Sequence, residues 1–330
     1  MKIVRLILFI VHIGIAFLLL GMLLNAYVPP KLFSWFNLLS LGFPVLITLY
    51  VLLTLFWIFC WKKRAILFAV LGLAFIKPIT RWVNYSSGDQ KDFDLKIVSF
   101  NVKNGVLGVK NIDNYVNGLD ADIILLQEHG GKDYNFNGVK EASIDAITAT
   151  FSKYKVINHK ELIKSDFETN NAYANQTDLE IRGKTYRIIN VYLQPFKFEK
   201  SMVKLNGNNE QNEQKLKGVI RRLIPTFKKH QEQVEIIREA IENSPYPVIV
   251  AGDLNSVPNS YEYYHLTKGL KDAFVTAGKG SATSFHDYKF PLRIDYVFSS
   301  EFIKPVNYRV DRSVRLSDHY PVVATFQLEK

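Results

Sequence analysis

Polar side chains recur at the ends of short apolar runs in this chain, and their types are those that bind cations and move protons. Six runs rich in Val, Ile, Phe and Tyr have the length and composition of buried strands. Because the ends of neighbouring strands meet at one edge of a sheet, we expect these polar groups to converge. Several acids so close together would repel one another strongly unless a cation lay between them. The pattern therefore predicts a metal-dependent hydrolytic site. The candidate residues are Asn101, Glu128, Tyr192, Asp253, Asn255, Asp295, Asp318 and His319.

Each of these strand ends also has a simpler explanation when it is considered alone. Asp and Asn often cap strands and begin turns, so a turn would account for any one of them. Six strand ends that all carry such a group are much more specific than any single one. An unused cluster of buried like charges would also be costly to keep.

Composition divides the chain into two unlike parts. The first 85 or so residues are almost wholly apolar, and the remainder has the composition of an ordinary soluble domain. The formal net charge is +10, but residues 1–90 hold eight basic residues and one acid, so the remainder is near +3. The high charge therefore gives poor support for a nucleic-acid-binding surface. The single cysteine, Cys60, excludes a disulfide within the chain.

Three apolar runs predict an N-terminal all-α transmembrane region over residues 1–84. Their expected helices cover about 4–25, 36–60 and 65–82. The first run is longer than the core of a usual signal peptide and lacks a clear cleavage site. The third run is shorter, and Lys77 and Pro78 interrupt it.

Basic residues around the apolar runs predict an orientation. Lys2 and Arg5 precede the first run, and the basic cluster 62–64 separates the second from the third. The positive-inside rule places both clusters in the cytoplasm, so three spans would put the following domain on the outer face. If the third run only lay on the membrane surface, that domain would be cytoplasmic. Lys77 and Arg81 mildly favour this alternative.

A polar linker over residues 85–94 leads to a predicted α/β domain over 95–330. We expect helices at about 109–119 and 209–243, the second broken or kinked at Pro225. The Lys- and Asn-rich segment 196–214 is expected to form a loop near the site. The expected strands are 96–101, 122–127, 177–182, 185–193, 247–252, 293–298 and 320–327.

The ordered motifs resemble the endonuclease/exonuclease/phosphatase family, whose fold is that of deoxyribonuclease I. The motifs are Ser99-Phe100-Asn101, Leu126-Gln127-Glu128, Asn190-Val191-Tyr192-Leu193, Gly252-Asp253-Leu254-Asn255, Arg293-Ile294-Asp295-Tyr296 and Ser317-Asp318-His319-Tyr320-Pro321. They occur in the family's order and cover residues from about 95 to 328. The resemblance implies a four-layer α/β/β/α sandwich of two mixed β-sheets flanked by helices. The segment after Asp253 also resembles the membrane-anchored bacterial branch of the family. Together with the three apolar runs and their flanking charges, this predicts a multi-pass protein of a bacterial inner membrane with a periplasmic or other extracytoplasmic catalytic domain.

The resemblance further implies a metal cofactor, Mg²⁺ or Mn²⁺. Glu128 matches the family's metal ligand, and Asn101 and Asp318 match residues close to that metal. Carboxylate oxygens are the ligands that such hard cations prefer.

The resemblance also implies catalytic roles. Asp253 matches the residue that activates the attacking water, and Asn255 one that orients the water or holds a phosphate oxygen. His319 matches the imidazole that stabilises the phosphoryl oxygens, and Asp295 the carboxylate that orients this imidazole. Tyr192 departs from the histidine of most members, although some DNA-repair members carry tyrosine. A phenol can donate to a phosphate oxygen; the alternative is a packed strand residue in a decayed site.

Three functions remain open from the sequence. The first is a membrane-anchored phosphodiesterase that acts on nucleic acid or on a phospholipid headgroup, such as that of sphingomyelin or a phosphoinositide. The second is a phosphomonoesterase that uses the same site. The third is a catalytically silent, membrane-tethered binding domain. The lipid bilayer and a phosphate-ester substrate are the implied partners, and no protein partner is implied.

Overall fold

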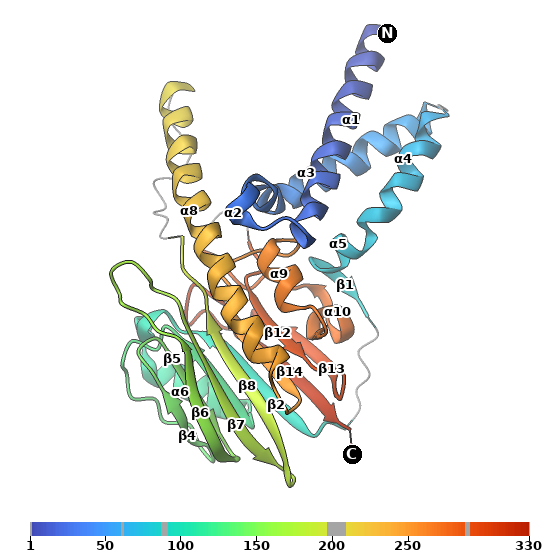
Figure 1. Ribbon diagram of the computed structural model, residues 1–330. Coiled ribbons are helices and arrows are strands. Elements are labelled where there is room, and N and C mark those ends of the chain that lie inside the picture. Colours follow the sequence, from blue (N-terminus) through green and yellow to red (C-terminus); the bar gives the residue numbers. More distant parts are fainter. Residues whose placement is uncertain (1, 61–62, 87–91, 197–208, 288–290, 330) are drawn as a thin grey trace.

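Two six-stranded sheets face each other in the computed structural model, which describes residues 2–60, 63–86, 92–196, 209–287 and 291–329 (Figure 1). The first sheet contains β2 (Leu95–Asn101), β3 (Ile123–Gln127), β4 (Lys140–Ile144), β5 (Thr148–Ser152), β13 (Ile303–Val310) and β14 (Val322–Leu328). The second contains β6 (Lys155–Ile163), β7 (Tyr173–Ile181), β8 (Lys184–Tyr192), β9 (Val248–Asp253), β10 (Lys271–Asp272) and β12 (Asp295–Ser299). Their orders are β13-β14-β2-β3-β5-β4 and β10-β12-β9-β8-β7-β6. Both sheets are mixed, because β2–β3 and β8–β9 are parallel and the other pairs are antiparallel.

The main core lies between the two sheets. Ile97 and Leu125 of the first sheet belong to the same buried cluster as Ile188, Ile249 and Val297 of the second. The apolar runs are long because strands of such a sandwich bury one face against the other sheet and the other face beneath helices.

Helices cover the outer faces of both sheets. On the first sheet, α6 (Val109–Gly118) buries Ile112 in a cluster with Ile124 and Leu126. On the second, α8 (Asn209–Glu242) and α9 (Tyr261–Leu266) pack against β8, β9 and β12. The layers are therefore helix, sheet, sheet and helices, and the predicted α/β class with two mixed sheets flanked by helices is confirmed.

The long helix α8 runs through Pro225, so the predicted break at this residue is wrong. Pro225 is exposed, and solvent can therefore reach the carbonyl group that has lost its helical partner. The adjacent Thr226 hydroxyl donates to the carbonyl oxygen of Arg222 at 2.9 Å. The loop expected over 196–214 falls largely outside the described residues, and its last part, from 209, belongs to α8.

Two long apolar helices begin the chain, α1 (Lys2–Leu23) and α3 (Trp35–Phe59), joined through η1 (Leu24–Ala26) and α2 (Pro30–Phe33). They are the two described helices that are long and apolar enough to cross a membrane. The third run differs from the expected single helix over 65–82. It forms α4 (Arg64–Gly72), the turn η2 (Leu73–Phe75) and α5 (Ile76–Thr80). Pro78 lacks the N–H group that would continue the helical hydrogen bonding across this break.

The helical region is fixed to the sandwich by buried polar contacts. The Asn37 side chain of α3 donates to both carboxylate oxygens of Glu262, at 3.1 and 3.0 Å. The Asn37 amide oxygen also accepts from the backbone N–H of Tyr261 at 2.7 Å. Strand β1 (Val83–Tyr85) then pairs with β11 (Lys279–Ser281), beside α10 (Ala273–Ala277). These contacts set the apolar helices against one end of the sandwich.

Candidate active site

The polar strand ends of both sheets meet at one end of the sandwich. Strand register aligns Tyr192 with Asp253 in the parallel pair β8–β9, and Asp295 with Asp253 in the antiparallel pair β9–β12. The residues that line a cavity of about 210 Å³ here include five predicted ones: Glu128, Tyr192, Asn255, Asp318 and His319. The other three, Asn101, Asp253 and Asp295, are buried and bonded to residues of this group. All eight predicted side chains therefore form one contiguous polar cluster.

A histidine held between two buried aspartates forms the deepest part of the cluster. His319 Nδ1 lies 2.8 Å from Asp295 Oδ2, and its Nε2 lies 3.7 Å from Asp253 Oδ2. Burial alone would lower the pKa of His319, but the negative charges of Asp295 and then Asp253 outweigh burial and raise the pKa. His319 is therefore an imidazolium at neutral pH, with Nδ1 donating to Asp295.

Asp253 is held on both carboxylate oxygens. The backbone N–H of Asn255 donates to Oδ1 at 2.8 Å, and Asn101 Nδ2 donates to Oδ2 at 3.0 Å. Burial raises the pKa of Asp253, and Asp295 raises it further, whereas His319 opposes the shift. A raised pKa makes this carboxylate a better proton acceptor than an exposed aspartate.

The turn that follows β9 places Asn255 over the cavity. Gly252 has a φ of 138°, and a Cβ atom here would lie only 2.0 Å from the carbonyl oxygen of Val191. Asn255 adopts a φ of 44°, and its side-chain Nδ2 donates to the carbonyl oxygen of Leu193 at 2.9 Å. The glycine thus lets β9 approach β8 closely, and the amide bridges the ends of both strands.

Glu128 is oriented by two donors from different strands. Asn101 Nδ2 and the Tyr192 hydroxyl donate to Glu128 Oε1 at 2.9 and 2.8 Å. Burial raises the pKa of Tyr192 well above its usual range, and the nearby Glu128 adds to the effect. The phenol therefore stays protonated and acts as a donor to the carboxylate.

Lys103 is a site residue that the sequence analysis missed. Its Nζ atom lies 2.5 Å from Asp318 Oδ2 and 3.9 Å from Asp287 Oδ2. Its backbone N–H donates to Asn101 Oδ1 at 3.0 Å, and its φ of 46° turns the chain at this point. Burial on its own would raise the pKa of Asp318, but His319 and Lys103 lower it below the usual value. The available signal was a lysine two residues beyond Asn101.

The oxygen atoms at the mouth of the cluster fit a small divalent cation. Glu128 and Asp318 line the same cavity, and carboxylates are preferred ligands of Mg²⁺. Lys103 places positive charge beside Asp318. Among the described residues, Asp253, Asp295 and His319 also offer three ligand atoms within 4.8 Å of one another. That group is consistent with a metal site when His319 is neutral, because an imidazolium has no free lone pair for a metal.

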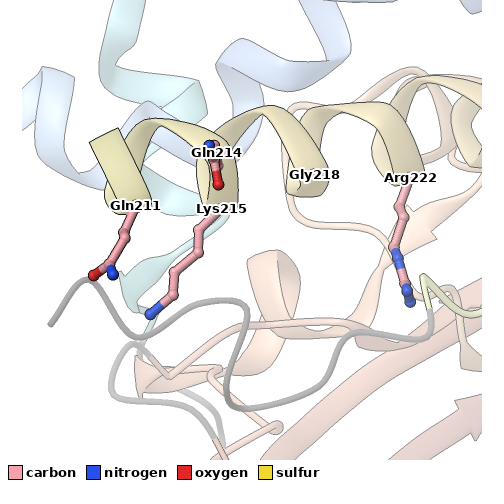
Figure 2. A pocket seen from close by; sticks show the side chains of 5 residues that line it. All are labelled: Gln211, Gln214, Lys215, Gly218 and Arg222. Carbon is pink, nitrogen blue, oxygen red and sulfur yellow. The ribbon is translucent and has the colours of Figure 1, made fainter. Parts of the chain in front are cut away.

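A larger hollow of about 620 Å³ lies elsewhere, beside the first turns of α8. Figure 2 shows Lys215 and Arg222 on the same side of that helix. The hollow contains none of the eight predicted residues, and its described lining offers no carboxylate. It therefore lacks the groups that hydrolysis at the acidic cluster would use.

Comparisons with known proteins agree with this geometry. Three solved structures share the fold of the sandwich at low sequence identity. Humanized D. rerio TDP2 has a TM-score of 0.51 and 16% identity, over 71% of this chain and 98% of that one. An endonuclease/exonuclease/phosphatase from Bacteroides vulgatus has a TM-score of 0.51 and 18% identity, over 72% and 100%. A protein described as an endonuclease/exonuclease/phosphatase family member, from Bacteroides thetaiotaomicron, has a TM-score of 0.50 and 18% identity, over 70% and 97%.

Two sequence families match adjacent parts of the chain. Residues 5–82 match a family described as a domain of unknown function (DUF8431). No curated protein matches the chain. Residues 98–319, which contain the whole acidic cluster, match the Endonuclease/Exonuclease/phosphatase family. Two thirds of the sequence, the two-sheet fold and the buried Asp253–Asp295–His319 cluster lead to the same assignment: the chain belongs to the endonuclease/exonuclease/phosphatase family.

Proposed function

We propose that this protein is a membrane-anchored, divalent-metal-dependent phosphoesterase that hydrolyses phosphodiester bonds. The observation that carries the proposal is the Asp253 carboxylate, buried and held by two donors beside a histidine that is paired with Asp295. Such an arrangement supplies a proton acceptor and a cationic hydrogen-bond donor within one small cavity.

Each side chain of the cluster has a role in this mechanism. Asp253 accepts a proton from the attacking water, while Asn255 positions that water or a phosphate oxygen. The His319 imidazolium donates to the phosphoryl oxygens as their charge grows, and Asp295 keeps its ring in place. Glu128 and Asp318 would hold Mg²⁺ or Mn²⁺ near Asn101, with Tyr192 fixing Glu128. When bound, the ion would polarise the phosphoryl group and neutralise developing charge.

The arrangement of the helices supports an extracytoplasmic catalytic domain in a bacterial inner membrane. Figure 1 shows the N-terminus and the start of α4 at the helix ends far from the sheets. The basic residues Lys2, Arg5 and Arg64 lie near those ends, and the positive-inside rule assigns such ends to the cytoplasm. The helical pieces from Arg64 to Thr80 return the chain to the sandwich, over roughly 25 Å at 1.5 Å per residue.

Hydrolysis of simple nitrophenyl esters tests the proposed chemistry. The detergent-solubilised full chain should cleave bis(p-nitrophenyl) phosphate with Mg²⁺ or Mn²⁺ and should lose this activity in EDTA. Asp253→Asn should lower kcat by about 10²–10⁴-fold, because general base catalysis is lost. The matched control is Asp120→Asn, whose side chain is exposed near the opposite end of β3 from Glu128.

Three outcomes separate the competing functions. Preference for p-nitrophenyl phosphate over the diester would favour a phosphomonoesterase at the same site. Equal activity in the two aspartate variants would remove Asp253 from the mechanism. No hydrolysis of either ester with either metal would favour the silent binding domain.

A further inference from the structure

The cavity at the acidic cluster has an extensive apolar wall. Besides the polar residues already described, it is lined by Leu41, Leu223, Val257, Phe285, Leu292 and Ile294. Among its described lining residues there is no lysine or arginine. A nucleic-acid backbone is normally met by several such cations, whereas an aliphatic chain needs apolar contact. The wall thus suits a substrate with an apolar portion next to its phosphate.

One of the wall residues comes from an apolar N-terminal helix rather than from the catalytic sandwich. Leu41 lies in α3, six residues after the helix begins at Trp35. The end of α3 that contains Leu41 faces the sandwich, because Asn37 in the same turn region bonds to Glu262. At 1.5 Å per residue, Leu41 is only about 9 Å from this end of the helix. If α3 crosses the bilayer as proposed, Leu41 lies in the outer part of one leaflet, next to the layer of lipid headgroups.

The apolar wall is continuous with the packing of the helices. Val257 and Ile294 belong to the same buried cluster as Leu19 of α1 and Phe43 of α3. Phe285 packs against this cluster, and its ring centroid lies 5.0 Å from that of His319. Apolar contacts therefore lead without interruption from the N-terminal helices to the catalytic imidazole.

Helix α8 contributes Leu223 to the wall. Figure 1 shows its first half projecting beyond the sheets in the same general direction as the N-terminal helices. Leu223 of this half lines the cavity, and Leu216, two turns earlier, is 54% exposed. Arg221 and Lys217 are exposed between them.

We infer that the substrate is a lipid phosphodiester whose apolar chain lies along Leu41, Phe285 and Ile294 while its phosphoryl group reaches His319 and Asp253. This inference rests on the proposed phosphoesterase function and names its substrate class. In the reaction, water forms a new P–O bond as the P–O bond to the leaving alcohol breaks. Asp253 takes one proton from the water and the leaving alkoxide gains one, so the products are an alcohol and a phosphomonoester.

Turnover by the full chain on three diesters tests the inference. The three diesters are long-chain phosphatidylglycerol in mixed micelles, its water-soluble short-chain homologue and bis(p-nitrophenyl) phosphate. A single-stranded DNA oligonucleotide is tested as a fourth substrate. We expect kcat/KM to be highest for the long-chain lipid. Leu41→Asn should lower the ratio of long-chain to nitrophenyl turnover at least about tenfold, because it removes the burial of one leucine-sized apolar surface.

The matched control is Leu49→Asn, on the same helix but 43% exposed and outside the cavity lining. It should leave the ratio unchanged. Leu292→Asn, on the loop before β12, gives a second test in case the helix variant does not fold. Three results would each overturn the lipid inference but not the proposed function. They are nitrophenyl turnover with no chain-length preference, an unchanged ratio in both wall variants, and preferred cleavage of DNA. Absence of turnover on all four substrates would overturn the proposed function with it.

Discussion

Tyr192 illustrates how one side chain can depart from a family pattern and still serve the site. The phenol is 6% exposed and donates to Glu128 Oε1 at 2.8 Å. Its raised pKa keeps the proton on the hydroxyl group. A tyrosine that was only packed into the strand of a decayed site would not make this hydrogen bond to a proposed metal ligand. Tyr192 therefore acts, in our proposal, as a positioning residue for Glu128.

Removing this hydroxyl group tests that role. Tyr192→Phe keeps the ring and its packing but leaves Glu128 with one donor fewer. We expect the Mg²⁺ concentration for half-maximal activity to rise about tenfold or more, because the loss of a ligand's hydrogen-bond partner typically weakens metal binding by 10–100-fold. Direct Mn²⁺ binding, followed by calorimetry, should weaken in parallel. An unchanged metal dependence with lower thermal stability would instead assign Tyr192 to packing alone.

The chemistry-bearing residues were predictable because each one lies at or next to one end of a buried apolar strand. Asn101, Glu128 and Asp253 follow runs that are buried on both faces, so hydrophobicity alone marks where the strand stops. Lys103 lies two residues beyond the end of β2 but is neither an acid, an amide nor an imidazole; it joins the cluster because a left-handed turn after β2 directs it to Asp318. Leu41 could not be predicted, since it comes from a helix that contacts the site only through the tertiary fold.

At the scale of elements, two of the strands that the sequence did not reveal, β6 and β4, lack an apolar signal. Strand β6 is an edge strand whose residues are mostly exposed, and β4 at the edge of the other sheet is similar. The predicted strand 177–182 begins at Tyr173 in the structure, because polar residues of β7 are buried too. Asn175, for example, donates to Thr148 Oγ1 at 2.9 Å across the two sheets. A buried hydrogen-bonded amide resembles a loop residue when only its polarity is considered.

In the membrane topology that we propose, the broken third helix determines on which side the catalytic domain lies. If α4, η2 and α5 together form a third pass, alkaline phosphatase fused to the C-terminus should be active in a bacterial host, and a green fluorescent protein fused there should stay dark. The same reporters fused after residue 63 should give the opposite result, because the basic cluster favours the cytoplasm. A fluorescent C-terminal fusion without phosphatase activity would mean two passes and a cytoplasmic catalytic domain.

At the scale of the whole molecule, a buried hydrogen-bonded histidine–glutamate pair joins the helical region to the catalytic sandwich. Glu262 of α9 and His230 of α8 are fully buried, with His230 Nδ1 2.7 Å from Glu262 Oε1. Asn37 of α3 donates to the same carboxylate, and His230 Nε2 lies 2.7 Å from the carbonyl oxygen of Gln194, near the cavity. Three helices and the chain segment after β8 therefore share one polar network. Such a network fixes the position of the apolar wall relative to the acids.

The titration of Glu262 should make this junction sensitive to acid. Burial alone would raise its pKa, but the hydrogen bond and charge of His230, together with Asn37, bring it below the ordinary value of 4.5. A carboxyl group with a lower pKa in the folded than in the unfolded state stabilises the fold above its unfolded pKa. That stabilisation is lost as the pH falls through the lower, folded pKa. The free energy of unfolding in detergent should therefore drop steeply below about pH 4.5.

Glu262→Gln isolates this contribution from the other acids. The variant removes the charge opposite His230, so we expect it to be less stable at neutral pH by about 3 kcal/mol. Its stability should also fall less steeply than the parent protein's on acidification, because the linked proton has been removed. Glu239→Gln, exposed on α8, is the matched control and should retain the parent's pH dependence. Superimposable pH profiles for the two variants would show that the stability of the junction does not depend on the Glu262–His230 contact.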